Sequence, residues 1–130
     1  MSNVKFYFCD KCKNIVAGVT AITDGVEHEI KCCGQPMQPL QPNVTEAAVE
    51  KHMTVVTVNG NTVTANIGEV THPMQEEHLI QWICLETTNG YQMKYLKAGD
   101  NPEVSFVLGD EKPVAVYEYC NLHGLWMHKI

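Results

Sequence analysis

Short runs of alternating apolar and polar residues fill the chain from residue 55 onward, and turn-forming residues separate them. The clearest turns are Asn59-Gly60-Asn61 and Thr88-Asn89-Gly90, both of the kind that joins two hairpin strands. The expected strands cover residues 55–58, 62–67, 78–86, 91–96, 104–108, 114–119 and 125–128. Short strands at this spacing are typical of an antiparallel β-sandwich of the immunoglobulin-like type, which we predict for residues 45–130.

The first 37 residues show a different pattern. We expect a short strand over residues 5–8 and a hairpin formed by residues 15–22 and 26–30 around Asp24-Gly25. A segment of this size is too small to fold around an apolar core alone, and such segments usually need a metal, a disulfide or a partner. Metal binding is therefore expected to be coupled to folding here.

Prolines separate the two segments. Pro36, Pro39 and Pro42 recur at every third position, which is the period of a polyproline II helix. We predict a semi-rigid connector over residues 38–44, and an irregular proline-rich loop would place the domain boundary at the same position. Residues 45–51 favour helix but are too few to form a stable helix of their own.

The composition is that of a soluble globular protein and not of a disordered one, with 45% hydrophobic and 18% charged residues among 130. A net charge of −6 without any cluster of lysines or arginines argues against nucleic acid and gives no affinity for an anionic membrane. The sequence also lacks a run of about 18 apolar residues and an export signal at its N-terminus. A cytoplasmic location is expected.

Four of the six cysteines form two pairs. Without an export signal, cysteines are expected to be reduced and available to metals. The spacing Cys9-x-x-Cys12 followed by Cys32-Cys33 predicts one tetrahedral all-cysteine site for iron or zinc. A purely structural zinc clamp is the alternative, whereas a thioredoxin-like redox pair is disfavoured because no βαβ pattern surrounds these residues.

A second set of metal-ligand side chains lies in the C-terminal segment. Cys120 and His123 are three residues apart at the end of a predicted strand, so one turn can offer a thiolate and an imidazole to the same ion. His52, His72 and His78 lie upstream in predicted loops. Ligands of this kind suit a redox-active transition metal better than calcium or magnesium. We predict an iron centre with four histidines and one cysteine.

The other residues of these types receive ordinary roles. A single histidine taken alone is more often a surface or hydrogen-bonded residue than a ligand, and we assign that role to His28 and His128. Cys84 lies within the apolar run 79–85 and is expected to be a buried core thiol.

Taken together, these motifs resemble the desulfoferrodoxin family of superoxide reductases, in order and over nearly the whole chain. The resemblance rests on Cys9-x-x-Cys12, Cys32-Cys33-Gly34, Glu50-Lys51-His52, His72-Pro73-Met74-x-x-x-His78, Trp82-Ile83, Gly99-Asp100-x-Pro102-Glu103 and Tyr119-Cys120-Asn121-Leu122-His123-Gly124-Leu125-Trp126. Because all four N-terminal cysteines are present, the chain resembles the two-iron class. Thr54 departs from the family pattern, which often has proline at this position, and the stretch between the cysteine pairs is a little long.

The resemblance implies a desulforedoxin-like domain over residues 1–37 whose iron is bound by Cys9, Cys12, Cys32 and Cys33. It implies a second, catalytic iron held in a plane by His52, His72, His78 and His123, with Cys120 as the axial thiolate. It further implies that Lys51 attracts superoxide and that Glu50 occupies the vacant iron position in the oxidised state.

The implied activity is the one-electron reduction of superoxide to hydrogen peroxide. Members of this family are usually homodimers from anaerobic or microaerophilic cells, with rubredoxin or a similar protein as electron donor, and the same is expected here. Two other functions are compatible with the ligands. A non-enzymatic electron carrier would need one iron per chain, and a dismutase would release oxygen and need no reductant.

Overall fold

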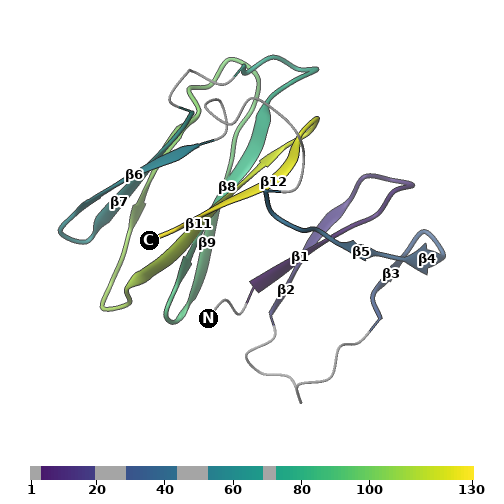
Figure 1. Cartoon of the computed structure of the whole chain (residues 1–130), viewed down its shortest axis with the longest axis horizontal. Coiled ribbons are helices and arrows are strands. Elements are labelled where there is room, and N and C mark those ends of the chain that lie inside the picture. Colours follow the sequence, from purple (N-terminus) through teal and green to yellow (C-terminus); the bar gives the residue numbers. More distant parts are fainter. Residues whose placement is uncertain (1–3, 20–28, 44–52, 69–72) are drawn as a thin grey trace. The chain divides into compact units, whose positions relative to one another are not determined.

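The computed structural model describes residues 4–19, 29–43, 53–68 and 73–130 of the chain, and the elements formed by these residues are β-strands (Figure 1). The chain divides into two compact units, Met1–Gln41 and Pro42–Ile130. The predicted extents of the two domains, 1–37 and 45–130, with a connector over 38–44, stay predictions. No helix in the described part of the chain is long and apolar enough to cross a membrane.

The first unit contains two small sheets. Strand β1 (Val4–Phe8) lies between β2 (Ile15–Val19) and β5 (Gln38–Pro39) and pairs antiparallel with both. Strand β3 (Lys31–Cys32) pairs with β4 (Gln35–Pro36). Gln38 and Pro39 therefore belong to a sheet, although the proline period predicted a separate connector there.

Residues 15–19 form the strand β2, as predicted, and it pairs with β1, a pairing that the sequence did not indicate. The two strands are joined through the turn that holds Cys9 and Cys12. The predicted turn Asp24-Gly25 and most of the second predicted strand lie outside the described residues. The apolar side chains Val4 and Phe6 of β1 are buried, together with Met37.

The second unit is a β-sandwich, as predicted. Its three-stranded sheet has the order β10-β7-β6, from strands β6 (Thr54–Asn59), β7 (Thr62–Ile67) and β10 (Glu103–Val107). Its four-stranded sheet has the order β12-β11-β8-β9, from strands β8 (Ile80–Thr87), β9 (Gly90–Tyr95), β11 (Pro113–Cys120) and β12 (Gly124–Lys129). All pairings are antiparallel, and each predicted strand of this unit overlaps an observed one.

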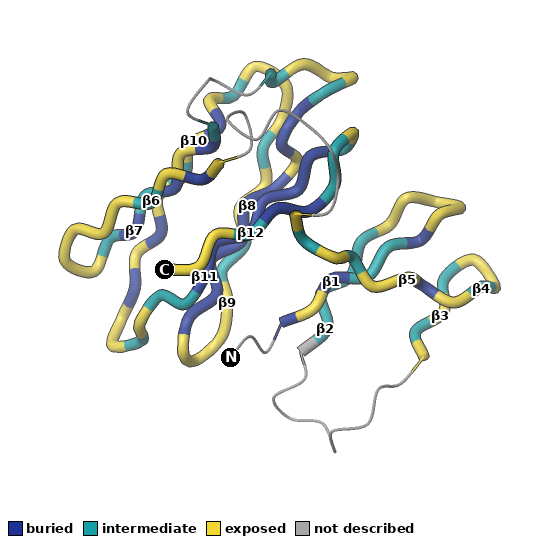
Figure 2. The backbone as a smooth tube through the Cα atoms, in the orientation of Figure 1, coloured by how far each residue is buried: buried dark blue, intermediate teal, exposed yellow. Residues whose placement is uncertain are grey.

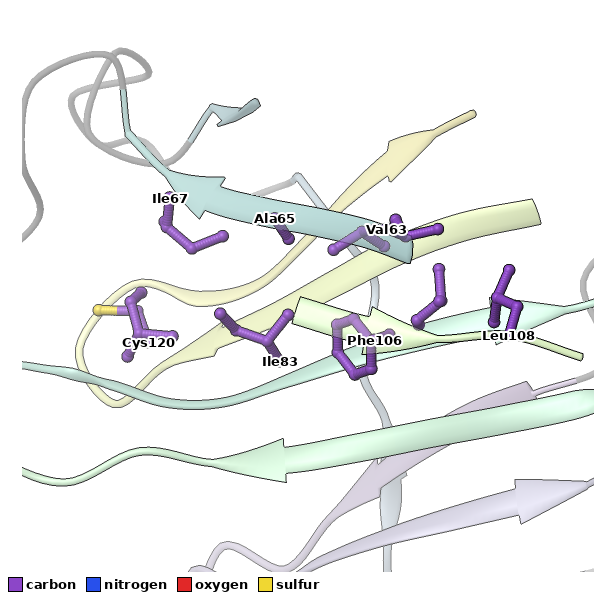
Figure 3. Close-up of a cluster of buried hydrophobic side chains, with 10 residues drawn as sticks. Val63, Ala65, Ile67, Ile83, Phe106, Leu108 and Cys120 are labelled. Carbon is purple, nitrogen blue, oxygen red and sulfur yellow. The ribbon is translucent and has the colours of Figure 1, made fainter. Parts of the chain in front are cut away.

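The core of the second unit lies between the two sheets. It is an apolar cluster drawn from both of them (Figures 2 and 3), formed by Val63, Ala65, Ile67, Ile80, Ile83, Leu85, Phe106, Leu108, Val116 and Cys120. Every second residue of β7 is fully buried, as expected for a strand with one face in the core. Cys120 lies at one end of this cluster, and Figure 3 shows its sulfur pointing away from the other labelled side chains.

An irregularity in the four-stranded sheet occurs next to Cys120. Along β11 and β8, Tyr119 pairs with Trp82 but Cys120 pairs with Ile80, so Gln81 is an extra residue on β8. A bulge of this kind bends the strand and redirects the adjacent side chains. As a result, the side chain of Ile80 lies in the core, opposite Cys120 at the end of β11.

Side chains of β9 link the edges of the two sheets. Gln92 Nε2 donates a hydrogen bond of 3.0 Å to the backbone carbonyl of Val107, and Lys94 Nζ donates to the carbonyl of Ser105. The Lys94 ammonium also lies 5.4 Å from the ring centroid of Phe106. These contacts occupy carbonyl groups of the edge strand β10, which would otherwise be open to pairing with another chain.

Candidate metal centres

The four N-terminal cysteines converge in the first unit. The sulfur atoms of Cys9, Cys12, Cys32 and Cys33 all lie within 4.8 Å of one another, and all four residues are free thiols. The Sγ atom of Cys32 lies 3.6 Å from that of Cys12 and 3.9 Å from that of Cys33. Four sulfurs around one zinc or iron ion at about 2.3 Å are separated by about 3.8 Å in a tetrahedron. The residues therefore fit a single tetrahedral ion.

Two tight turns bring these cysteines together. In the first turn, the backbone N–H of Lys13 donates to the Cys9 carbonyl at 2.8 Å, and Cys9 N–H donates to the carbonyl of Asn14 at 2.9 Å. Lys13 has a left-handed backbone with φ of 66°. In the second turn, Cys33 and Gly34 are both left-handed, with φ of 54° and 76°. Gly34 adopts this conformation without strain, whereas Cys33 requires support from its surroundings.

The pKa values of the cysteine thiols in this cluster are shifted in different directions. A hydrogen bond from the Cys12 backbone lowers the pKa of the Cys9 thiol to about 7, despite an opposing effect of burial. The side chain of Cys12 is the main cause that raises the pKa of Cys32, which reaches about 12, and that of Cys33. Four crowded thiols therefore resist full ionisation unless a cation compensates the charge, so metal binding must displace protons from this site.

A second cluster lies at one end of the sandwich. The ligand atoms of His78, Cys120 and His123 are all within 4.8 Å of one another. Cys120 Sγ lies 3.8 Å from His123 Nδ1, and the rings of His78 and His123 meet at 84° with centroids 5.0 Å apart. Because metal bonds to cysteine sulfur and histidine nitrogen are about 2.0–2.3 Å long, these three side chains fit one shared ion.

Cys120 combines burial with hydrogen-bond donors. It is the last residue of β11 and is fully buried, and burial is the main cause that raises the pKa of its thiol. The backbone N–H groups of Leu122 and His123 act in the opposite direction, because they point at the sulfur and favour its anion. A buried sulfur with two N–H donors is suited to carry negative charge when a metal ion is adjacent.

His78 is held in a tight turn. Gln75 and His78 exchange two backbone hydrogen bonds, of 2.9 Å and 3.0 Å, and β8 begins two residues later. The Nε2 atom of the His78 ring is buried. The rings of His78 and His123 belong to partly exposed residues, and Leu122 in the loop after Cys120 is 59% exposed.

Four of the predicted site residues lie outside the described residues. These are the two remaining histidine ligands and the two catalytic candidates, His52, His72, Glu50 and Lys51. His28 also lies outside them, while His128 is exposed on β12. Cys84 is fully buried, as predicted, and burial raises the pKa of its thiol to about 12.

The sequence did not indicate a buried carboxyl in the second unit. Glu118 is fully buried among the inward-facing residues of β11, two positions before Cys120. Burial raises its pKa to about 9, although a hydrogen bond from Thr54 lowers it. The available signal was its position in the alternation, because Glu118 shares the face of Val116 and Cys120.

Comparisons with known proteins identify the family of the chain. A family model described as Desulfoferrodoxin matches residues 44–129. The desulfoferrodoxin of Syntrophotalea carbinolica is 42% identical over 95% of this chain and 94% of its own length. That of Nitratidesulfovibrio vulgaris is 38% identical over 94% of this chain and 93% of its own length.

Solved structures show the same relationship. The superoxide reductase from Treponema pallidum superposes on 98% of this chain and 100% of its own, with a TM-score of 0.82 and 35% identity. The one-iron superoxide reductase from Giardia intestinalis covers 62% of this chain and 97% of its own, with a TM-score of 0.54 and 31% identity.

Proposed function

The chain belongs to the desulfoferrodoxin family, and we propose that it acts as a superoxide reductase. In this reaction one superoxide anion takes up one electron and two protons to give hydrogen peroxide, and no oxygen is released. The observation that carries the proposal is the convergence of His78, Cys120 and His123 at the end of a sandwich similar to known superoxide reductases.

The proposed cofactor is iron, at two ions per chain. One ion is assigned to Cys9, Cys12, Cys32 and Cys33, whose sulfur spacing suits a tetrahedral metal. The other is assigned to His78, Cys120 and His123, with His52 and His72 as the remaining ligands. When bound in the second site, ferrous iron supplies the electron that reduces superoxide.

The residues of the second site have separate tasks in this proposal. Cys120 provides a thiolate, whose charge is supported by the N–H groups of Leu122 and His123. The histidines would bind the ion as neutral imidazoles, and a small substrate would bind to the same ion. Glu50 is assigned as a ligand of the oxidised ion. Protons come from solvent, which reaches the loop around the exposed Leu122.

Attraction of the substrate has to be local. The protein carries a net charge of −6, so its overall field repels an anion such as superoxide. Lys51, next to the proposed ligand His52 in the sequence, is the residue that we assign to this attraction.

The electron donor, the oligomeric state and the cellular location are proposed from the family resemblance. We propose a rubredoxin-like electron donor, relay of electrons through the four-cysteine iron, a homodimer, and a cytoplasmic location in an anaerobic or microaerophilic cell. The domain division that accompanies this proposal is an iron domain at 1–37, a linker at 38–44 and a catalytic domain at 45–130.

A superoxide pulse tests the proposal. Full-length protein loaded with iron is exposed to a known amount of superoxide, with and without a reducing partner, and hydrogen peroxide and oxygen are both measured. We expect one hydrogen peroxide per superoxide consumed, no oxygen from the reaction, and repeated turnover only with the reductant. One hydrogen peroxide and one oxygen per two superoxide anions, without a reductant, would instead indicate a dismutase.

A further inference from the structure

We propose that Asn121 is a positioning residue for His78, a role that rests on the metal centre of the proposed function. Its side-chain amide binds the backbone on both sides of His78. In this way it fixes that histidine relative to the other two ligand side chains, Cys120 at the end of β11 and His123 in the loop that follows.

The hydrogen bonds of Asn121 bracket His78 along the chain. Asn121 Nδ2 donates to the backbone carbonyl of Glu77 at 3.0 Å. The backbone N–H of Leu79 donates to Asn121 Oδ1, also at 3.0 Å. A third bond runs from the backbone N–H of Asn121 to the carbonyl of Leu79, at 3.3 Å. The residues immediately before and after His78 are therefore both held by one side chain.

Other hydrogen bonds of the described residues also hold the segment around His78. On its N-terminal side it forms the two-bond turn with Gln75, and on its C-terminal side Ile80 N–H donates to the thioether of Met74 at 3.4 Å. These contacts fix the turn within its own segment, and the N–H of Gly99 donates to the Met74 carbonyl at 2.9 Å. The Asn121 amide has a different role, because it connects the residues on both sides of His78 to the loop between β11 and β12.

The bulge in the sheet explains why such a connection is required. Regular pairing between β11 and β8 is interrupted between Tyr119 and Cys120, so the sheet register alone does not set the distance between the two ligand segments. Pairing resumes with Cys120 opposite Ile80 in a shifted register, and Asn121 follows directly. Its amide adds two hydrogen bonds to the segment of His78 just beyond this shift, in the manner of an additional peptide group.

The chemistry of the amide makes the role specific. An asparagine side chain has a donor and an acceptor in a fixed plane, and both are used here. Aspartate has almost the same shape and retains the acceptor for Leu79 N–H, but it places a carboxylate oxygen against the carbonyl of Glu77. Leucine keeps the approximate volume and loses both hydrogen bonds. The pair of variants therefore separates loss of one side-chain hydrogen bond from loss of both, while the backbone bond from Asn121 N–H to the Leu79 carbonyl is kept in each.

The expected effect is on metal affinity at one of the two centres. Residues that orient metal ligands typically change affinity by about 10-fold to 100-fold when they are replaced. Full-length protein loaded with two irons is titrated with a chelator, and the iron remaining in each centre is followed by its own absorption. For Asn121→Asp and Asn121→Leu we expect the histidine-cysteine iron to be lost at about 10-fold to 100-fold lower chelator concentration, and more readily in the leucine variant.

Two controls are built into this titration. The four-cysteine iron lies in the other unit and should be released at an unchanged chelator concentration in every variant. Asn89→Asp makes the same chemical change in the hairpin turn at the opposite end of β8 and should behave as wild type. Hydrogen exchange of amides in β7 and β10 reports whether the sandwich itself is intact.

A second measurement is independent of the metal. Hydrogen exchange of the backbone amides over residues 77–80, in the full-length protein as isolated, should be at least about 10-fold faster in both Asn121 variants, because opening then requires fewer hydrogen bonds to break. Unchanged exchange and unchanged chelator resistance in Asn121→Leu would overturn the proposal. If wild type fails to reduce superoxide but shows the slow exchange, the proposed function fails and the positioning role of Asn121 stands.

Discussion

The hydroxyl of Thr54 donates a hydrogen bond of 3.5 Å to the carboxyl of Glu118 inside the sandwich. Both residues are buried, on β6 and β11 respectively. Thr54 follows the proposed ligand His52 by two positions, and Glu118 precedes Cys120 by two. The contact thus connects two strands that each lead to a predicted ligand, at the position where Thr54 departs from the family pattern.

The buried carboxyl predicts a specific dependence of stability on pH. The pKa of Glu118 is about 9 in the folded protein against an ordinary value of 4.5, so between these values the folded state holds a proton that the unfolded state releases. The contribution of Glu118 to the free energy of unfolding is then complete at low pH and is lost as pH rises through this window. In Glu118→Gln we expect a smaller fall in stability between about pH 5.5 and about pH 8.5.

Urea unfolding of the metal-free protein at both pH values measures this effect without interference from metal loss. Glu103→Gln is the matched control, because Glu103 is exposed at the start of β10. The control should keep the wild-type pH dependence. If Glu118→Gln also keeps it, the carboxyl is ionised in the folded state and the prediction is wrong.

A second prediction concerns the edge of the four-stranded sheet. Asn43 accepts a hydrogen bond from the backbone N–H of Met127 at 3.0 Å and donates to the carbonyl of the same residue at 3.3 Å. Its own N–H donates to the carbonyl of Leu125 at 2.9 Å. Asn43 therefore covers the open edge of β12, and its left-handed backbone, with φ of 63°, places it there.

Replacement of Asn43 should lower the free energy of unfolding. In Asn43→Gly the left-handed backbone is retained and two side-chain hydrogen bonds are lost, for which we expect a loss of about 1–2 kcal/mol in urea unfolding. Asn43→Ala should be less stable again by about 1 kcal/mol, because alanine is strained in this conformation. A glycine variant as stable as wild type would show that the amide contributes nothing.

A third prediction distinguishes the two clusters by single substitutions. Cys12→Ser and Cys120→Ser should each reduce the iron content from about two ions per chain to about one, with loss of different absorption bands. Cys120→Ser should abolish the reduction of superoxide. The pre-reduced Cys12→Ser protein should still reduce one superoxide per chain, since its second centre is intact. Loss of that single turnover would show that the four-cysteine centre is needed for the chemistry itself.

Much of the sandwich was predictable because the alternation of apolar and polar residues and the turn-forming residues match the strands that are observed. Alternation along 62–67 and the Asn59-Gly60-Asn61 turn predicted β7 and its pairing with β6, and both are observed. The pairing of β2 with β1 was not predicted. That hairpin runs through the cysteine turn between the two strands, whose residues were interpreted only as metal ligands.

The clusters were predictable in part for a similar reason. Cysteine and histidine are common metal ligands, so the convergence of His78, Cys120 and His123 could be predicted from their spacing and from the family resemblance. The residue types of Asn121 and Glu118 do not indicate a metal site. The role of Asn121 depends on contacts next to a bulge, which the order of residues does not show, and the only signal for Glu118 was its place in the alternation along β11.

A fourth prediction concerns the thiol of Cys84. It is fully buried, and its pKa of about 12 keeps it protonated at neutral pH. The thiolate is the reactive form of cysteine, so Cys84 should resist alkylation in the native protein and react once the protein is unfolded. Mass spectrometry of peptides after treatment with iodoacetamide measures this. Rapid labelling of Cys84 in folded, metal-loaded protein would show that the sandwich opens readily.

The last prediction tests local attraction of the substrate. Since the net charge of −6 opposes the approach of superoxide, removal of an attracting lysine should slow the bimolecular step and weaken its dependence on salt. For Lys51→Ala we expect a rate constant about 10-fold lower at low ionic strength and a flatter decline as salt is added. Lys97→Ala removes the same charge from an exposed lysine after β9 and controls for the change in net charge. Equal effects of the two substitutions would mean that superoxide responds to the total charge alone, and Lys51 would then have no special role in capture.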